Sequence, residues 1–358
     1  MLAIPVRLEM EPAAAGSLLP QAGGLRIGPY RLPNRTLVAP MAGVTDRPFR
    51  QLCRRLGAGY AVSEMAASNP KLRDSVKTAR RINHDGEAEP KAVQIAGADP
   101  AMMAEAARFN VDRGAQIIDI NMGCPARKVC NLAAGSALMG DEALAVRIIA
   151  AVVAAVDVPV TVKMRTGTDA GTFGGAMITV HGRTRACQYH GVVDYETIAR
   201  VKASVGVPVV ANGDIDSPEK ARDVLRATGA DAIMIGRAAQ GRPWIFREID
   251  HYLGSGAKLA SPTWREIWSL LRQHLLDHYA FYGEFAGVRT ARKHIGWYLR
   301  GMQQDRLLAD GLIGEMSTLR TRINASETPE AQLDLIDEFF SDRERVLDTC
   351  TETGETLQ

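Results

Sequence analysis

The chain has 358 residues, of which 46% are hydrophobic and 23% are charged. This composition is that of a globular protein, excludes wholesale disorder, and leaves room for about two domains. The formal net charge is only +2, so any nucleic-acid surface must come from local clustering of charge. The five cysteines form no CxxC pair, which indicates a reducing compartment and argues against a disulfide scaffold and a zinc ribbon; we expect no metal.

Residues 1–24 begin without a basic region, and prolines and glutamates interrupt their apolar runs. We therefore predict a disordered N-terminal extension rather than a signal peptide. No stretch of the chain approaches the roughly 18 apolar residues of a membrane span, so we expect no membrane association.

Short apolar runs rich in Val and Ile alternate with helical patterns from Thr36 to about Leu253. Such runs are typical of parallel strands that are buried on both faces, and Gly or Pro punctuates most of their ends. Eight runs within about 220 residues favour a (β/α)8 TIM barrel over residues 25–253, with a doubly wound sheet as the alternative. The runs are 36–42, 60–65, 91–97, 116–123, 158–164, 177–182, 207–213 and 230–236.

Capping signals locate three of the helices between these runs, because Asp and Ser side chains accept hydrogen bonds from the first turn of a helix. The caps are Asp99, Asp141 and Ser217, and the helices that they begin are predicted to end near residues 113, 156 and 227.

The composition changes after Leu253. Residues 254–262, GSGAKLASP, read as a linker, and the amphipathic pattern that follows predicts a small α-helical domain over residues 263–345. Within residues 326–358 two basic residues stand against ten acidic ones. Residues 346–358 are therefore expected to form a flexible acidic tail.

The connection between the fifth and sixth predicted strands is unusually short. Only TGTDAGTFGGA lies between Arg165 and Met177, and its four glycines oppose a helix. A parallel crossover needs at least about 10–12 residues, so we expect the fifth barrel helix to be missing. Outward side chains of both strands are then expected to meet water and to leave the barrel marginally stable. They are Val160, Val162, Ile178 and Val180.

Polar and chemically versatile residues stand at the C-terminal ends of the predicted strands. Core packing alone does not put functional groups at the ends of successive strands, whereas the active sites of TIM barrels lie at this face. The sequence therefore predicts an active site there. The residues are Met41, Glu64, Gln94, Asn121, Cys124, Lys163, Arg165, His181, Asn212, Asp214, Gly236 and Arg237.

Cys124 follows the fourth predicted strand, between Gly123 and Pro125, in a turn that faces the predicted site. A thiol with an ordinary pKa of about 8.5 is protonated at neutral pH and can act as a general acid, or as a nucleophile if its pKa is lowered. The alternative is a small buried hydrophobic residue. The strand-end position favours a catalytic function.

Two glycine-bearing turns, Asn212-Gly213-Asp214 and Gly236-Arg237, follow the seventh and eighth predicted strands. TIM barrels commonly bind phosphate at these two positions, and Arg237 adds a forked positive charge. No GxGxxG follows the first strand, so a mononucleotide such as FMN fits better than a dinucleotide. Two ordinary turns are the alternative.

Lys163 lies in the otherwise apolar strand VTVKMR, where a buried amine is costly unless it faces a partner. Beside a flavin such a cation stabilises the reduced ring, whereas in an aldolase-like barrel it forms a Schiff base. His181 ends the sixth strand, and a ligand-facing and a structural function stay equally open for it.

Arg289, Arg292 and Lys293 fall three and four residues apart on one face of a predicted helix, and Trp297 and Tyr298 follow them. Basic residues beside aromatic ones can hold phosphates and stack bases. The alternative is a solvated helix face with Trp297 in the core. On spacing alone, we favour the solvated face.

Ten stretches, which cover nearly all of residues 25–300, form one specific pattern. They are APMAGVTDRPFR (39–50), VSEM (62–65), VQIAG (93–97), DINMGCPARKV (119–129), GSALM (135–139), VPVTVKMRTG (158–167), VHGRTRACQYHG (180–191), ANGDI (211–215), MIGRAAQGRPWIFREI (234–249) and ARKHIGWYL (291–299). In this order they resemble the tRNA-dihydrouridine synthases, most closely their bacterial B-type subfamily. That family has a full helix where this chain has its short crossover.

The resemblance implies an FMN-binding TIM barrel followed by a helical tRNA-binding domain, in a cytoplasmic enzyme expected to be a monomer. Such enzymes reduce specific uridines in tRNA to 5,6-dihydrouridine, and NADPH or NADH restores the flavin. Hydride passes from flavin N5 to uracil C6, and Cys124 matches the acid that protonates C5. The target base has to leave its stack to reach the flavin.

The resemblance also implies a function for each remaining site residue. Three groups of residues are expected to contact FMN. The ring is expected to be lined by Pro40, Met41 and Ala42, and its polar groups to be bound by Gln94, Lys163 and His181. The phosphate end is expected to be bound by Asn212, Gly213, Asp214, Gly236 and Arg237. Those at the RNA are Asn121 and Arg165 beside the uracil, and Arg289, Arg292 and Lys293 on the helical domain.

Two alternatives remain. The shortened crossover at 168–176 can leave a tRNA-binding homologue with impaired catalysis. The chain can also be another FMN barrel oxidoreductase acting on a small pyrimidine, although such a substrate needs no basic helical domain.

Overall fold

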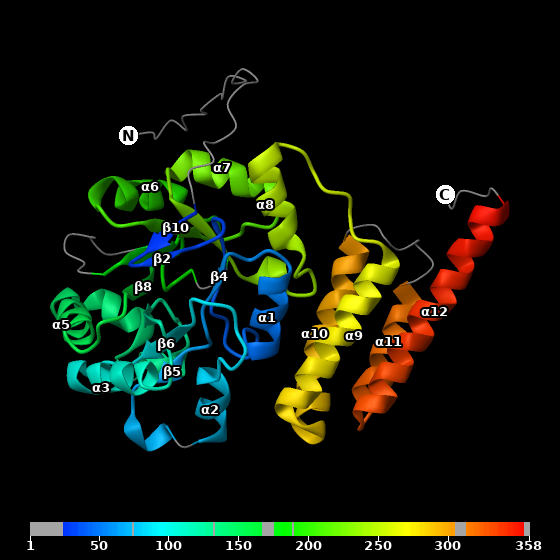
Figure 1. Ribbon diagram of the computed structural model, residues 1–358, viewed down its shortest axis with the longest axis horizontal. Helices are drawn as coiled ribbons and strands as arrows, with labels where there is room; N and C mark the ends of the chain where they lie inside the picture. Colours follow the sequence, from blue (N-terminus) through cyan, green and yellow to red (C-terminus); the bar gives the residue numbers. More distant parts are fainter. Residues whose placement is uncertain are drawn as a thin grey trace, which may run out of the picture.

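The computed structural model of the chain describes residues 24–73, 75–131, 133–166, 175–187, 190–304 and 313–353. Apart from Gly24, the predicted N-terminal extension lies outside these residues. So do residues 168–174 of the predicted crossover and residues 354–358 of the predicted tail. The described chain forms an α/β barrel with a group of long helices beside it (Figure 1).

Parallel strands form one sheet, in the order β4-β3-β11-β10-β9-β8-β7-β6-β5. A parallel bridge between Val62, just after β4, and Ala92 of β6 joins the two ends of this sheet and closes the barrel. The predicted barrel is confirmed, although the second predicted strand is divided into β4 and β5. The strands are β3 (Thr36–Val38), β4 (Tyr60–Ala61), β5 (Ala66–Ala67), β6 (Ala92–Ala96), β7 (Ile117–Met122), β8 (Val160–Arg165), β9 (Met177–His181), β10 (Val209–Asn212) and β11 (Ala232–Ile235).

The barrel helices begin where the capping residues predict. Asp99, Asp141 and Ser217 each accept a hydrogen bond from the backbone of the first turn of α3, α5 and α7. The barrel helices are α1 (Arg47–Arg55), α2 (Val76–Ile82), α3 (Pro100–Val111), α4 (Arg127–Cys130), α5 (Glu142–Val153), α6 (Tyr195–Ser204), α7 (Pro218–Thr228) and α8 (Ile245–Ser255). Short 3-10 turns cover Pro70–Leu72, Gly135–Gly140 and Arg237–Ala239.

A two-stranded hairpin precedes the barrel and is absent from the sequence prediction. It pairs β1 (Arg26–Ile27) with β2 (Tyr30–Arg31), and Ile27 is fully buried against inward side chains of the barrel such as Met177 and Val210. Strands of two residues are too short to show a period of hydrophobicity, which is why the sequence gives no sign of them.

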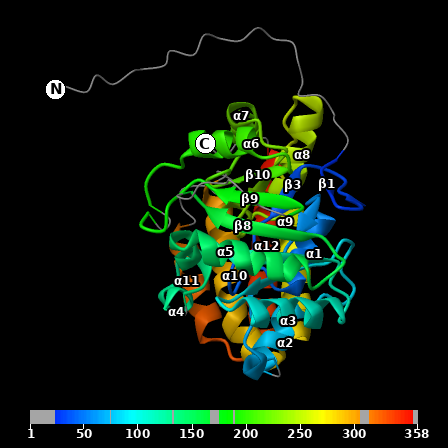
Figure 2. The same cartoon turned by 90° about the vertical axis from the view of Figure 1, so that its left-hand side faces the viewer.

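The outer faces of β8 and β9 are covered, so the prediction that they meet water is wrong. Their outward side chains share one hydrophobic cluster with apolar residues of α5 and α6, such as Ile148 and Ile198. Figure 2 shows β8 and β9 between these two helices. The exposed fractions are 3% for Val160, 0% for Val162, 0% for Ile178 and 1% for Val180.

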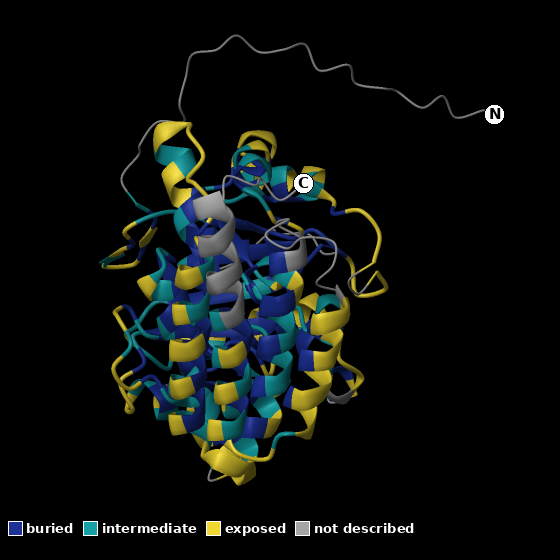
Figure 3. Ribbon diagram, turned by 90° about the vertical axis from the view of Figure 1, so that its right-hand side faces the viewer, coloured by how far each residue is buried: buried dark blue, intermediate teal, exposed yellow. Residues whose placement is uncertain are grey.

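Four helices form the C-terminal domain: α9 (Trp264–Tyr282), α10 (Glu284–Gln304), α11 (Ile313–Ala325) and α12 (Pro329–Thr353). Thr263 and Glu266 build a capping box that begins α9 directly after the linker. Figure 3 shows exposed residues along the outward faces of these helices and buried ones toward the barrel. None of the described helices has the length and apolar character that crossing a membrane demands.

Helix α12 continues to Thr353, through most of the stretch predicted to be a flexible tail.

The helical domain packs closely against the barrel near α1. Trp244 of the barrel lies in the core of the helical domain, and Trp297 of α10 packs against the core of the barrel. Gly241 has a φ of +75°, and a Cβ there would lie 2.2 Å from the backbone of Trp297. Arg55 and Asp277 form an ion pair of 3.2 Å across this boundary.

We predict that Ile178→Ala lowers the free energy of unfolding by about 2–5 kcal/mol, because it opens a cavity in a fully packed layer. Val192→Ala is the control, since that side chain is 93% exposed and its truncation should change the free energy by less than about 0.5 kcal/mol. Urea unfolding measures both. An effect of Ile178→Ala as small as that of the control would mean that the face is not packed.

Candidate active site

A pocket of about 590 Å³ lies at the C-terminal ends of the barrel strands. All the barrel residues predicted for the cofactor, the catalytic acid and the uracil line it, which the strand-end pattern anticipated. They are Pro40, Met41, Ala42, Gln94, Asn121, Cys124, Lys163, Arg165, His181, Asn212, Gly213, Asp214, Gly236 and Arg237. The lining also includes Val44, Met65, Arg127 and Gln240, which the sequence analysis did not select.

A chain of hydrogen bonds runs from the barrel interior to the backbone of Cys124. Asp119 accepts from Thr161 Oγ1 at 2.5 Å and from Gln94 Nε2 at 2.7 Å. Asn121 Nδ2 donates to Gln94 Oε1 at 2.8 Å, and Asn121 Oδ1 accepts from the Cys124 amide at 3.0 Å. The Asp119 carboxylate at one end of this series of hydrogen bonds can only accept, and the Cys124 amide at the other end can only donate. The side-chain amides of Gln94 and Asn121 can therefore each take only one orientation.

Cys124 is half-buried, and its burial raises the pKa of the thiol despite the opposing charges of Arg165 and Lys163. The thiol therefore stays protonated at neutral pH and can give up a proton as a general acid. Arg165 Nε donates to the Gly123 carbonyl at 2.7 Å and Arg165 Nη1 donates to the Thr184 carbonyl at 3.0 Å, which fixes the loop that carries the thiol.

Lys163 and His181 both line the pocket, from the neighbouring strands β8 and β9, where His181 is paired in register with Arg165. Burial lowers the pKa of Lys163 to about 8, while the nearby charge of Asp119 opposes that change. Lys163 Nζ donates to Asn212 Oδ1 at 2.9 Å, and Asn212 Nδ2 donates to the Met234 carbonyl at 2.7 Å. Burial and the neighbouring cations lower the pKa of His181 to about 3, so this imidazole is neutral.

The two glycine turns form one end of the pocket. Gly213 has a φ of +132°, and a Cβ there would come within 2.8 Å of Val193. Asp214 is paired with Arg183 and, at 2.6 Å, with Arg237. A second cavity of about 290 Å³ adjoins this end and shares Gly236 and Arg237 with the pocket.

The three predicted basic residues of α10 lie outside this pocket and point to different partners. Arg289 is exposed and stacks on Phe285 at 3.6 Å. Arg292 donates to the Ser326 carbonyl at 3.0 Å. Lys293 donates to the carbonyl of Gly43, in the loop after β3 that also lines the pocket, and burial lowers its pKa. They do not form a single exposed patch.

Sequence reasoning missed Asp119 and gave Arg183 no function. Asp119 is 2% exposed in β7, and burial raises its pKa to about 6. A carboxylate inside the run IIDINM carries the same signal as a lysine inside VTVKMR, because either charge is costly in a buried strand without a partner. That signal was available from the sequence.

A closed parallel barrel with a polar pocket at the carboxyl ends of its strands is the architecture of TIM-barrel enzymes. The sequence model of one such family, Dihydrouridine synthase (Dus), matches residues 37–333. The chain belongs to the dihydrouridine synthase family, which confirms the resemblance stated from its motifs.

Several relatives match over most of their length. The tRNA-dihydrouridine synthase B of Pseudomonas aeruginosa is 57% identical over 332 residues, which covers 89% of this chain and 97% of the relative. The tRNA-dihydrouridine synthase B of Shewanella oneidensis is 53% identical over 330 residues, which covers 89% of this chain and 99% of the relative. Among solved structures, histamine dehydrogenase from Rhizobium sp. 4-9 is similar with a TM-score of 0.47 and 12% identity, covering 70% of this chain and 50% of that one, too weakly to carry an argument.

We predict that Asp119→Asn disturbs the loop of Cys124, whereas Thr161→Val does not. An amide at position 119 can keep its oxygen toward Gln94 only by turning its NH2 group toward the Thr161 hydroxyl, so one buried N–H is left without a partner and the negative charge at the start of the chain is lost. An unpaired buried donor costs about 1–3 kcal/mol, so the free energy of unfolding falls by that amount. Thr161→Val removes one hydrogen bond but keeps the direction of the others.

The rate at which Cys124 reacts with a thiol reagent distinguishes the two variants. The background carries Cys187→Ser and Cys350→Ser, because Cys187 is exposed while Cys53 and Cys130 are buried. We expect a several-fold change in rate for Asp119→Asn and none for Thr161→Val. Equal rates in both variants would show that the hydrogen-bond chain does not hold the loop.

Proposed function

We propose that this chain reduces uridines in tRNA to 5,6-dihydrouridine with bound FMN and with NADPH or NADH as the reductant. Residues 25–253 then form the flavin barrel and residues 263–345 the tRNA-binding domain. The observation that carries the proposal is one pocket in which a protonated thiol, a buried lysine and two glycine turns lie together. The relatives named tRNA-dihydrouridine synthase B support the substrate. Such a substrate makes the cytoplasm the site of the reaction.

The pocket fits a flavin mononucleotide. Its volume lies within the roughly 300–1,000 Å³ of cofactor and ligand sites. Ala39, Met41 and Val44 offer an apolar wall for a ring system. At Gly236 a Cβ would stand within 3.6 Å of Met41 and Ala39, so the missing side chain leaves room against that wall. Bound flavin supplies the hydride that reduces the C5–C6 double bond of uracil.

Polar groups of the chain then have separate functions around the ring. Lys163 is a cation held by Asn212 beside Gln94, where positive charge favours an electron-rich ring. His181 is neutral and offers a hydrogen bond without adding charge. Gly213, Gly236 and Arg237 suit the phosphate, although Arg237 shares its charge with Asp214.

Cys124 gives the second hydrogen of the product. Its thiol, kept protonated by burial, donates a proton to C5 of the uracil, while Asn121 and Arg165 hold its loop and border the base. A proton donor fixed on one side of the base makes the addition directional. The half-buried position also limits access of water to the thiol.

The helical domain supports tRNA rather than a small pyrimidine as the substrate. Lys293 joins α10 to the loop of Gly43, so the helical domain stands next to the mouth of the pocket. A base that leaves the RNA stack can enter the barrel while the backbone rests on this domain. Burial of β8 and β9 also removes the reason to expect a weakened barrel and impaired catalysis.

We predict that Cys124→Ala retains FMN and still oxidises NADPH, but reduces tRNA about 10²–10⁴-fold more slowly, because only the proton transfer to C5 is lost. Single-turnover formation of dihydrouridine, followed by mass spectrometry of tRNA, is the measurement. Cys187→Ala is the matched control, since that thiol is exposed and lies outside the pocket lining. Turnover by Cys124→Ala at the control's rate would refute the assignment.

We predict that replacing Arg289, Arg292 and Lys293 by Ala weakens tRNA binding and reduces its dependence on salt by about 0.7–0.9 in slope per lost phosphate contact. NADPH oxidation should be unchanged by Arg289→Ala alone, because this side chain is exposed and contacts Phe285 rather than the loop of the pocket. Arg200→Ala on α6 is the control, because α6 lies across the barrel from the helical domain (Figure 1). An unchanged slope in the triple variant would mean that none of these three side chains contacts an RNA phosphate.

A further inference from the structure

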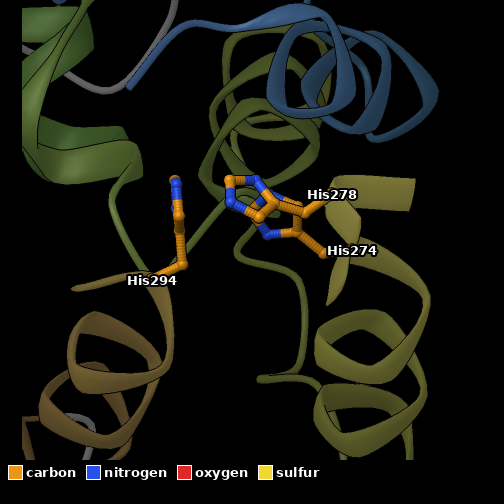
Figure 4. Close-up of side chains that lie close together, drawn as sticks. All are labelled: His274, His278 and His294. Carbon is orange, nitrogen blue, oxygen red and sulfur yellow. The ribbon is translucent and has the colours of Figure 1, made fainter. Parts of the chain in front are cut away.

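Three buried histidines meet between the helical domain and the barrel. His274 and His278 lie one turn apart on α9, and His294 lies on α10. Their exposed fractions are 0%, 1% and 2%. Figure 4 shows the rings from α9 projecting toward the ring from α10, and one ring nitrogen of each lies within 4.8 Å of the others.

Most of the ring nitrogens in this cluster have no hydrogen-bond partner. Both nitrogens of His274, Nδ1 of His278 and Nε2 of His294 are buried and unsatisfied. Buried polar atoms are rarely left in this condition without an ion, a water or a function. Four such atoms in one cluster make it a candidate site for an ion or a water.

The hydrogen bonds around His278 determine its tautomer. His278 Nε2 lies 2.8 Å from Thr290 Oγ1, and that hydroxyl donates its own proton to the Ala286 carbonyl at 2.6 Å. Nε2 therefore carries the proton and donates to Thr290, which leaves a lone pair on Nδ1 facing the cluster. A ligating histidine in a metal site is commonly fixed in this way through its other nitrogen.

A carboxylate completes the set. Asp46 is 1% exposed at the start of α1, where its Oδ1 accepts from the Phe49 amide and its Oδ2 lies 3.6 Å from His278 Nδ1. The Tyr282 hydroxyl forms a hydrogen bond with the same carboxylate. Neighbouring ligand atoms around a tetrahedral ion with bonds of 2.0–2.1 Å stand about 3.4 Å apart, close to this separation.

We propose that His274, His278, His294 and Asp46 bind one divalent transition-metal ion, with Zn²⁺ as the best fit. Three imidazoles and one carboxylate are ligands that zinc accepts in closed tetrahedral sites. The ring centroids are 4.8, 5.2 and 6.3 Å apart, and rings around one tetrahedral ion stand about 5 Å apart. Only a small inward movement of the rings is needed to close the site.

The charged side chains around the cluster include more negative than positive groups, which favours a bound cation. Asp46, Glu64 and Asp277 contribute negative charge near the cluster, while Lys293 and Arg55 oppose them. The hydrogen bond of His278 Nε2 to Thr290 leaves Nδ1 with a lone pair, and a neutral imidazole of this kind is the form that binds a metal ion.

An ion at this position would fasten the two domains together. Its ligands come from α9 and α10 of the helical domain and from the start of α1 in the barrel. The expectation of no metal, drawn from the absence of CxxC pairs, overlooked the pair His274-x3-His278 on one helix face. The third histidine and the aspartate come from distant parts of the chain, so sequence spacing does not reveal the set.

The test uses the full chain without an affinity tag, purified without chelators. Metal analysis should find about one zinc per chain. After removal of the metal, titration with Co²⁺ should give the intense visible absorption of a tetrahedral ion at one equivalent. Because the unsubstituted protein is used, this result does not depend on a variant that folds.

Variants then assign the ligands. His278→Gln and His294→Gln should lose the metal and the Co²⁺ absorption. His84→Gln should keep both, since His84 is a buried histidine whose two nitrogens already bond the Ile82 and Arg113 carbonyls at 2.8 and 2.9 Å. Zinc at a hundredfold excess over its Kd should raise the Tm of the metal-free protein by roughly 4 °C and leave that of His294→Gln unchanged.

Three results would overturn the proposal. One is a wild-type chain that neither contains zinc nor binds Co²⁺ at one equivalent. Another is full metal content in folded His278→Gln and His294→Gln. The last is a thiolate charge-transfer band with Co²⁺, which would assign the ion to a cysteine.

Discussion

The buried carboxylate of Asp119 constrains the rest of the barrel interior. It lies on β7 between Thr161 and Gln94, and its charge acts on Lys163 of the adjacent strand β8. A buried charge is tolerable only when hydrogen bonds and a counter-charge surround it, so the polar groups around it must keep fixed orientations. The series of hydrogen bonds continues from Gln94 through the Asn121 side chain to the backbone amide of Cys124. The position of the thiol thus follows from a group that never reaches the pocket lining.

The interface between the two domains is a second constraint on the structure. It depends on aromatic packing, whereas the barrel interior depends on a buried charge and its hydrogen bonds. Aromatic side chains cross this interface in both directions, with Trp244 in the helical core and Trp297 against the barrel core. Several buried polar atoms at the same interface have no hydrogen-bond partner among the described residues, and the histidine cluster beside Asp46 is the clearest case. Lys293 links this region to the loop of Gly43 at the pocket. A change in the packing between the two domains would therefore alter the position of the loop that lines the pocket.

The covered outer faces of β8 and β9 show how local reasoning can mislead. A short, glycine-rich connection predicts that no long helix forms in those residues, but exposure of the flanking strands does not follow from it. Ile178 and Val162 belong to a layer that includes side chains of α5 and α6, which come from other parts of the sequence. Burial is a property of everything that packs on a face, and a single connection does not determine it.

The sequence by itself determined the barrel and most of the polar residues of the pocket, while Pro40 and Ala42 came only from the resemblance to the family. The barrel and the polar residues follow from the alternation of apolar runs and from connectivity, because the carboxyl ends of parallel strands must meet at one face. Tertiary structure decided the features that join distant parts of the chain. Asp119 becomes an orienting group only when Gln94 and Thr161 lie beside it, and Arg289, Arg292 and Lys293 separate because each meets a different neighbour. The histidine cluster also needs α1, α9 and α10 to converge, and contacts of this kind depend on packing rather than on spacing along the chain.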